Sequence, residues 1–225
     1  MLKGARREHK TVMQIAQFYT DAFFSDCEKL GIKAEFQPIA WAAKDTELKT
    51  KNIDCIWNGM TATDELKNQI NFSGAYMNNS QVAVIRKADA AKYKDLASMS
   101  GAKVVAEAGS AGEIAVKADA GLSKSYLPVK DQGTSLMEVK SKTADIAIID
   151  AVTAAGSIGE GTDYDDLMIV DVISDADSEV YAVGIRQGDT ELTAKINAAI
   201  KELYDDGTLA KLADKYNLSG RIIAQ

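Results

Sequence analysis

The hydrophobic positions of this 225-residue chain follow two spacings that alternate along its length. From Val12 to Leu30 the apolar residues recur at i, i+3, i+4 and i+7, the spacing of one helix face, and Gly31 is a natural stop after it. Elsewhere, short apolar runs bounded by glycine and polar residues are typical of buried strands. We expect strands at 33–41, 53–57, 80–87, 124–129, 144–150, 167–173 and 179–186. We expect further helices at 43–51, from 64, and at 133–142, 151–159, 189–207 and 208–218, with a short helical turn at 95–101.

Two segments share one layout: a buried strand, a small polar corner and then a helix. They are "NIDCIWNGMTATDELK" (52–67) and "KVVAEAGSAGEIAVK" (103–117). The alternation of strands and helices predicts the α/β class with parallel sheets. In open α/β sheets such corners lie at the carboxyl edge of the sheet, where ligands bind. Two corners that face each other across a cleft would make a two-lobed binding protein.

Polar residues with capping chemistry stand at several helix starts. For the helix at 133–142 the candidate caps are Thr134 and Ser135. Asp189 is the expected cap of the helix that follows it, and Thr208 starts the last helix.

The charge of the chain narrows the classes of partner. Its net charge of −7 at pH 7 argues against nucleic acid and anionic membrane surfaces, which bind to basic patches. No run approaches the roughly 20 apolar residues of a membrane-spanning helix. The first ten residues, "MLKGARREHK", are basic without an apolar segment behind them, so we expect no secretory signal peptide in this chain. That leaves open a cytoplasmic protein or the trimmed form of an exported one.

Residues that usually carry metal or redox chemistry are scarce. Cys27 lies on a helical pattern and Cys55 on a strand pattern, and we expect two buried free thiols rather than a disulfide framework. With His9 as the single histidine, a histidine-based metal site or a Ser-His triad is disfavoured. No phosphate-binding loop or dinucleotide fingerprint occurs, so we expect no cofactor.

Longer stretches carry a family resemblance. The segment "IAWAAKDTELKTKNIDCIWNGMTATDELKNQINFSGAYMNNSQVAVI" is similar to the first lobe of type II periplasmic solute-binding proteins for amino acids. The match continues through "AEAGSAGE", "ADIAIIDA", "EVYAVGIRQGDTEL" and "LYDDGTLAKLADKYNL", and covers about residues 19 to 220.

The resemblance implies a fold and a place of action. It implies two α/β lobes joined by two crossover strands, each lobe a mostly parallel sheet flanked by helices, that close on a ligand by a hinge motion. Lobe 1 is expected at 1–80 and 182–225, and lobe 2 at 81–181. The family also implies an extracytoplasmic protein, periplasmic or tethered as a lipoprotein, that delivers its solute to an ABC permease.

In the first corner the resemblance assigns three ligand-binding residues. Gly59 and Thr61 match the positions that offer a backbone group and a hydroxyl to the ends of the ligand. Asn58 is the neighbouring position, able to reach the ligand's side chain. The alternative for all three is a capped corner with a purely structural role.

The second corner and the strand at 144–150 supply the other candidates. Gly109, Ser110 and Ala111 match the loop whose amides and hydroxyls meet the ligand carboxylate at a helix N-terminus, where the helix dipole favours an anion. Asp150 matches the acid that pairs with the α-ammonium. It ends an apolar strand, where a carboxylate is costly unless paired, although it could simply cap the next helix.

One departure from the family falls on the carboxylate end of the ligand. Leu66 stands where most of the family has an arginine that grips the α-carboxylate through two parallel hydrogen bonds. Lys67 is a poor substitute, because one residue on a helix turns the side chain by about 100°. Ala111 removes another donor, since the family often has threonine or serine there. These changes favour a solute without a free α-carboxylate, or one held only by amides of the second lobe.

A second departure concerns the start of the fold. The family begins with a strand and a loop that holds an aromatic clamp, but only 20 residues precede Asp21, which aligns with the first helix. Those residues are helix-patterned, so we expect the first strand of lobe 1 to be missing. A second copy of the chain could fill the gap by strand exchange. Phe18, Tyr19 and Phe23 are candidates for the clamp, with core packing as their alternative role.

Three functions remain in contention. The favoured one is a receptor that binds an amino acid or related small polar solute without catalysis. The alternative is a truncated or altered family member that has lost high-affinity binding and acts as a dimeric or partner-docking protein. An enzyme would need an acid-base pair. The best candidate for such a pair is Asp150 with Glu107 or Glu113. No histidine, lysine or cysteine in the corners completes a mechanism, so we expect no enzyme.

Overall fold

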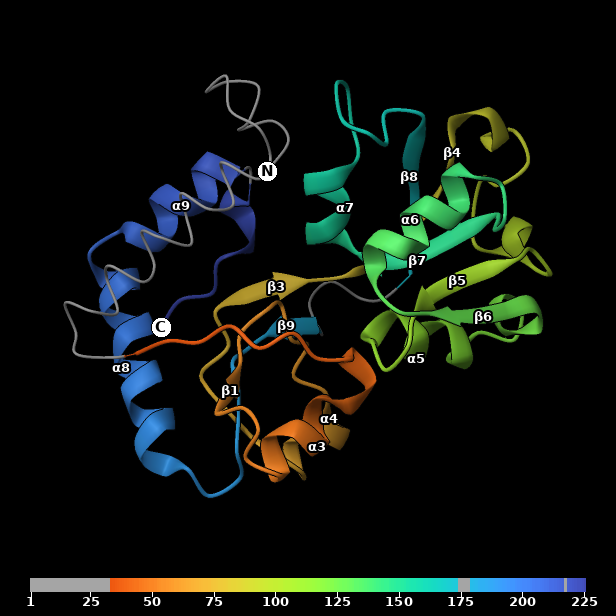
Figure 1. Ribbon diagram of the computed structural model, residues 1–225. Helices are drawn as coiled ribbons and strands as arrows, with labels where there is room; N and C mark the ends of the chain where they lie inside the picture. Colours follow the sequence, from red (N-terminus) through yellow and green to blue (C-terminus); the bar gives the residue numbers. More distant parts are fainter. Residues whose placement is uncertain (1–32, 174–178, 217) are drawn as a thin grey trace.

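The computed structural model describes residues 33–173, 179–216 and 218–225, which form two groups of elements on either side of a short ribbon (Figure 1). The helices are α3 (Lys44–Lys49), α4 (Asp64–Lys67), α5 (Ala111–Ala118), α6 (Gln132–Lys140), α7 (Ala151–Ser157), α8 (Thr190–Asp205) and α9 (Thr208–Tyr216). The strands are β1 (Cys55–Ile56), β2 (Asn71–Phe72), β3 (Met77–Asn79), β4 (Gln81–Arg86), β5 (Val104–Glu107), β6 (Tyr126–Val129), β7 (Ile146–Asp150), β8 (Leu167–Val172), β9 (Glu179–Tyr181) and β10 (Gly184–Ile185). A 3-10 turn, η1 (Trp41–Ala43), precedes α3.

The larger group, called here the second lobe, is built on a five-stranded sheet in the order β6-β5-β7-β4-β8. Strand β5 runs parallel to β6 and β7, whereas β4 runs antiparallel to β7 and β8. Side chains alternate between the two faces of β4. Val82 and Val84 enter the core cluster that includes Leu136 of α6, and Ile85 enters the cluster that includes Val116 of α5. The sheet is therefore buried on both faces, as expected of an α/β lobe.

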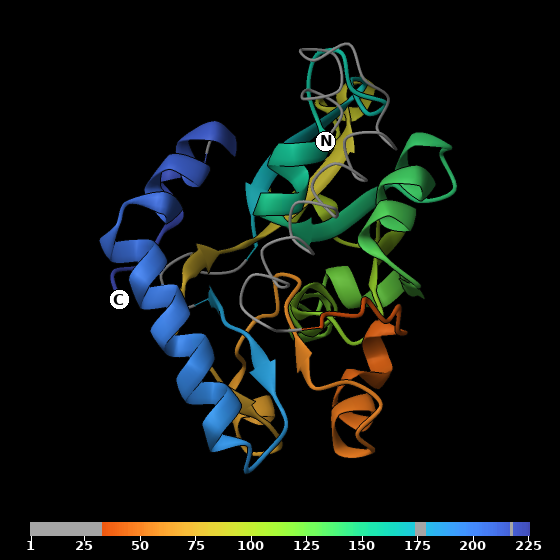
Figure 2. The ribbon, with the colours of Figure 1, turned by 60° about the vertical axis from the view of Figure 1, so that its left-hand side comes forward.

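The smaller group, called here the first lobe, contains the three-stranded sheet β1-β10-β2 with α3, α4, α8 and α9. Leu48 of α3 packs with Ile56, Met60 and Ile70, all of which are buried. The described pairs of this sheet are antiparallel, so the expectation of a mostly parallel sheet is wrong for these strands. Strands β3 and β9 pair antiparallel and lie between the two lobes (Figures 1 and 2).

Most of the expected elements are present, and the differences have local causes. The expected strand at 33–41 does not form, because Pro38 lacks a backbone donor and Phe36, at 63% exposed, has no sheet face to cover. The strand at 53–57 contracts to β1. The segment 179–186 divides into β9 and β10, because it pairs first with β3 and then with β1 and β2.

Helix α6 begins earlier than the sequence pattern indicates. Asp131 is its cap and accepts a hydrogen bond from the Thr134 amide at 2.6 Å, so the expected caps Thr134 and Ser135 are wrong. The prediction for α8 is confirmed, since the Asp189 carboxylate accepts from the Leu192 amide at 3.1 Å.

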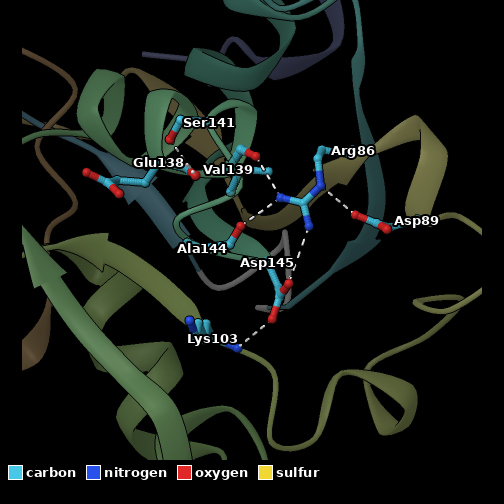
Figure 3. Close-up of polar contacts among 8 residues, drawn as sticks. All are labelled: Arg86, Asp89, Lys103, Glu138, Val139, Ser141, Ala144 and Asp145. Atoms are coloured by element: carbon cyan, nitrogen blue, oxygen red, sulfur yellow. Dashed lines mark hydrogen bonds and ion pairs between the residues drawn. The ribbon is translucent and has the colours of Figure 1, made fainter.

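A partly buried arginine holds the end of β7 that lies farthest from Asp150 (Figure 3). Its guanidinium donates to the carbonyls of Val139 and Ala144, both at 2.7 Å. The same group, Arg86, forms ion pairs with Asp89 at 2.6 Å and Asp145 at 3.3 Å. These bonds tie β4 to the turn between α6 and β7, and so fix the strand that carries Asp150.

Some expectations lie outside the described residues. They are the helix at 12–30, the missing first strand, Cys27 and the aromatic candidates Phe18, Tyr19 and Phe23. Within the described residues, none of the helices is long and apolar enough to cross a membrane.

Candidate functional site

The two polar corners line one cleft between the lobes. The cleft is lined by Trp41, Lys44, Asn58, Gly59, Thr61, Thr63, Leu66, Glu107, Gly109, Ser110, Ala111, Ile114, Gln132 and Asp150. All seven residues proposed from the sequence are among them, so the structure brings the whole predicted set together.

The first corner is shaped by one glycine and anchored by one methionine. Gly59 has φ +67°, a conformation that glycine adopts at least cost, and a Cβ there would lie 3.3 Å from the Tyr181 ring. Met60 is fully buried in the core of the first lobe. The Thr61 hydroxyl donates to the carboxylate of Glu179 at 3.0 Å. The corner is therefore a fixed turn that presents its backbone to the cleft.

The second corner leads into α5. Ser110 is the helix cap and accepts from the Glu113 amide at 3.1 Å, and the Glu113 carboxylate accepts from the Gly109 amide at 2.8 Å. This is a variant of the capping box. The first N–H groups of α5, beginning with Ala111, have no acceptor within the helix and sit at its positive end. They are the part of the cleft wall best suited to an anion.

Asp150 stands at the centre of a buried network of amides. One carboxylate oxygen accepts from Asn79 at 2.8 Å and from Gln81 at 2.6 Å, and the other accepts from Gln132 at 2.5 Å. The same two amide groups of Asn79 and Gln81 also donate to Glu179, at 2.6 and 2.8 Å. Asp150 is only 8% exposed, and no lysine or arginine of the described residues lies within ion-pair distance of it. The network orients a negative charge into the cleft without neutralising it.

The charge on Asp150 also affects a neighbouring phenol. Burial, followed by the charge and hydrogen bonding of Asp150, raises the pKa of Tyr181 far above its usual value. Tyr181 is 3% exposed and remains neutral, so the negative charge in this part of the cleft belongs to carboxylates alone.

Glu107 adds a second acidic group to the cleft. Burial, together with repulsion from Asp131 and Asp150, raises the pKa of Glu107 to about 7, while Lys44 opposes the rise. Glu113, the other acid considered for an enzyme, does not line the cleft and is bound to Tyr126 at 2.9 Å as well as to the corner. Of the two acid pairs considered, Asp150 and Glu107 therefore both line the cleft, whereas Glu113 does not join Asp150 there.

Sequence reasoning missed two cleft residues at the start of the first lobe's helix α3, Trp41 in the turn before it and Lys44 as its first residue. Lys44 is 7% exposed, and its ammonium group donates to the carbonyl of Gly109 at 2.8 Å and to that of Trp41 at 3.3 Å. Burial lowers its pKa. The signal was its spacing from Leu48, since i and i+4 share one helix face and Leu48 is in the core.

Leu66, which stands where most of the family has an arginine, lines the cleft. Lys67 does not, because it is bound to Asp64 at 2.8 Å on the exposed side of α4. Trp41 is the aromatic residue that lines the described part of the cleft.

Comparisons with known proteins bear on the sequence, the fold and the role. The family described as "Bacterial extracellular solute-binding proteins, family 3" matches residues 18–219. The arginine-binding extracellular protein ArtP of Bacillus subtilis is 31% identical over 213 residues, which cover 93% of this chain and 80% of that protein. The L-cystine-binding protein TcyJ of Escherichia coli K12 is 26% identical over 188 residues, covering 83% and 68%.

Solved structures agree. A substrate-binding protein of an ABC uptake transporter from Streptococcus pneumoniae with bound histidine has a TM-score of 0.75 and 32% identity, covering 88% of this chain and 82% of that one. An ancestral arginine-binding protein bound to glutamine has a TM-score of 0.75 and 29% identity, covering 88% and 86%.

These matches confirm the predicted two-lobed α/β class, the resemblance and the solute-binding role. They do not favour the alternative of an altered member that has lost binding.

Proposed function

We propose that this chain, which belongs to the bacterial extracellular solute-binding proteins of family 3, binds an amino acid in the cleft and delivers it to an ABC permease. Lobe 1 would comprise 1–80 and 182–225, and lobe 2 would comprise 81–181. The two lobes would close about the ribbon of β3 and β9 (Figure 2).

The observation that carries the proposal is Asp150. A buried carboxylate is costly unless a cation or several donors compensate it. Three amides hold it in place, and it still lacks a cation among the described residues. The α-ammonium of an amino acid supplies that cation, and it fits a carboxylate that already faces the cleft.

The two corners serve the rest of the solute. The Gly59 backbone and Asn58 stand on one side, and Ser110 with the first turn of α5 stands on the other. Trp41 offers an aromatic face, which packs against aliphatic stems and attracts cations. The predicted binding residues Asn58, Gly59, Thr61, Gly109, Ser110, Ala111 and Asp150 are proposed here as the site.

The balance of charge favours a solute with a cationic side chain. Among the described residues that line the cleft, Glu107 and Asp150 are acidic and Lys44 is the one basic residue. Relatives named as arginine-binding proteins fit this preference. We therefore place basic amino acids first among the solutes.

Catalysis does not form part of the proposal. An enzyme would need a group that accepts a proton and a second that donates one to the same substrate. Glu113 is bound to the α5 corner, and Lys44 is bound to two carbonyls.

The strand-exchanged dimer stays a prediction, because it depends on the opening strand, and the solution mass of the chain tests it.

A thermal-shift panel of the twenty L-amino acids tests the proposal. At a solute concentration of 100 times Kd, binding adds about 2.7 kcal/mol of stability, which raises Tm by roughly 5–10 °C for a chain of this size. We expect such a shift for at least one amino acid, greatest for a basic one, and its loss in Asp150→Asn. The control Asp166→Asn, which alters an exposed carboxylate of the same lobe, keeps the shift. No shift with any amino acid at millimolar concentration would overturn the proposal.

A further inference from the structure

We propose that Lys44 is the cation that binds the α-carboxylate of the solute, in the role that an arginine at position 66 would otherwise fill. The inference rests on the proposed function, since it concerns an amino acid in the same cleft. It assigns a binding role to a residue that the sequence pattern places only in a short helix.

The first ground is that Lys44 is a buried cation without a counter-ion. It is 7% exposed, and no carboxylate of the described residues lies within the 4.0 Å of an ion pair. An ammonium group has three N–H donors, and the carbonyls of Gly109 and Trp41 take two of them. The Trp41 ring, 5.1 Å from the ammonium, compensates the charge in part. A buried charge is stable only when it is well compensated, so the third donor and the lack of a carboxylate partner among the described residues point to an anionic ligand.

The second ground is where the ammonium lies. Its bond to the Gly109 carbonyl, at 2.8 Å, places it at the corner that leads into α5. That corner carries the Ser110 cap and the first free N–H groups of the helix, which attract anions. A side-chain cation from the first lobe and a helix N-terminus from the second lobe thus meet at one point of the cleft.

The third ground is that no other lysine or arginine of the described residues lines the cleft. Leu66 lines the cleft but carries no charge, and Lys67 is bound to Asp64 outside it. Lys130 lines an adjoining cavity, is 79% exposed and lies beside Asp131 at 3.7 Å.

With Lys44 in this role, the cleft matches both ends of an amino acid. Asp150 faces the α-ammonium, and Lys44 with α5 faces the α-carboxylate. Leu66 therefore does not imply a solute that lacks a carboxylate, because the cation has moved to another element of the same lobe.

A simpler role for Lys44 is to hold the two lobes together through the Gly109 carbonyl. The two roles differ in which solutes they affect. A latch supports every solute equally, whereas a carboxylate partner supports only solutes that carry the carboxylate. A comparison of an amino acid with its α-carboxamide separates them.

The experiment measures Kd by titration calorimetry for L-arginine and L-argininamide, or for the tightest binder of the amino-acid panel and its amide. A hydrogen bond to a charged group is worth about 10- to 100-fold in affinity. We expect the full chain to prefer the acid by at least tenfold. In Lys44→Met the acid loses about 10- to 100-fold and the amide less than threefold. Adding Leu66→Arg to Lys44→Met restores at least tenfold of the preference for the acid.

Lys49→Met is the matched control, since Lys49 lies on the same helix at half exposure and outside the cleft. It keeps the affinity of the unaltered chain. Lys44→Gln serves if Lys44→Met does not fold, with the same expected loss of preference. Equal losses for acid and amide, or an unchanged preference, would overturn the inference. Absence of binding by any amino acid to the unaltered chain would instead overturn the proposed function.

Discussion

Replacing Gly109 by alanine tests whether the lobes must meet at the α5 corner for solute to bind. Gly109 has φ +75°, and a Cβ there would lie 2.9 Å from the Cα and 3.3 Å from the Cβ of Ala42 in the first lobe. Ordinary contact begins at 3.4 Å, and both neighbours are main-chain or rigid atoms. The two lobes must therefore separate by about 0.5 Å at this point, the difference between 3.4 and 2.9 Å.

The separation acts on the hydrogen bond from Lys44 to the Gly109 carbonyl. That bond is 2.8 Å long, and a shift of half an ångström along it lengthens it past the ordinary range. A hydrogen bond from a charged group is worth about 1.5–3 kcal/mol, and each 1.4 kcal/mol is tenfold in affinity. We therefore expect Gly109→Ala to weaken solute binding by roughly 10- to 100-fold.

Gly101→Ala separates this effect from the cost of the backbone conformation. Gly101 has φ +79°, nearly the same as Gly109, but no atom lies within 4 Å of its Cβ position. Both variants lose about 1–2 kcal/mol of unfolding free energy, since alanine is strained at positive φ. Titration calorimetry measures the affinity, and urea unfolding measures the stability. The expectation fails if Gly109→Ala loses the same stability as Gly101→Ala and its Kd for the solute stays within twofold of that of the unaltered chain.

Three further substitutions have distinct expected outcomes. Asp150→Asn turns an acceptor into a donor that faces other amides, so it lowers the unfolding free energy by about 1–3 kcal/mol in urea and abolishes the amino-acid thermal shift. Arg86→Met leaves two carbonyls without their donor and two carboxylates without their partner. It costs about 3 kcal/mol in urea unfolding, whereas Kd stays within twofold because the site is at the other end of β7. Glu107 gains its charge as pH rises through about 7, so affinity for L-arginine rises from pH 6 to pH 8 in the unaltered chain and is flat in Glu107→Gln. Because the folded-state pKa of Glu107 is raised, the unaltered chain also loses stability relative to Glu107→Gln as pH rises from 4.5 to 7, which thermal unfolding at fixed pH measures.

The corners could be predicted from the sequence because their chemistry is local. A glycine at positive φ and a cap such as Ser110 are needed wherever a strand turns sharply into a helix, so residue type and position identify both corners. Asp150 could be predicted for a similar reason, since a charged residue at the end of a buried strand is rare without a partner. Local sequence order therefore predicts the two corners, whereas the ligand-binding roles of their residues and of Asp150 come from the family resemblance and stay predictions.

Other features depend on contacts between distant segments, which a single sequence does not reveal. The Lys44 ammonium donates to the carbonyl of Gly109, which is 65 positions away, and nothing near Lys44 in the sequence indicates that contact. The segment 33–41 alternates like a strand, but alternation forms a strand only where a neighbouring strand and an apolar face exist. The cap of α6 was misplaced because Asp131, Thr134 and Ser135 all have capping chemistry, and the start of the helix decides between them.

The two departures from the family now have different standing. The expected absence of an opening strand concerns residues outside those described. The loss of arginine at position 66 concerns the cleft itself, which Leu66 lines together with Lys44, a lysine that has no carboxylate within ion-pair distance among the described residues. With Lys44 in its proposed role, the carboxylate end of the site is rearranged and not removed.

A crystal structure of the full chain grown with its tightest-binding L-amino acid would show how both ends of the solute are held. We expect one solute molecule in the cleft, with its ammonium within hydrogen-bond distance of Asp150 and its carboxylate between Lys44 and the first turn of α5. A solute bound elsewhere, or bound in the cleft with its carboxylate directed away from Lys44 and α5, would contradict this expectation.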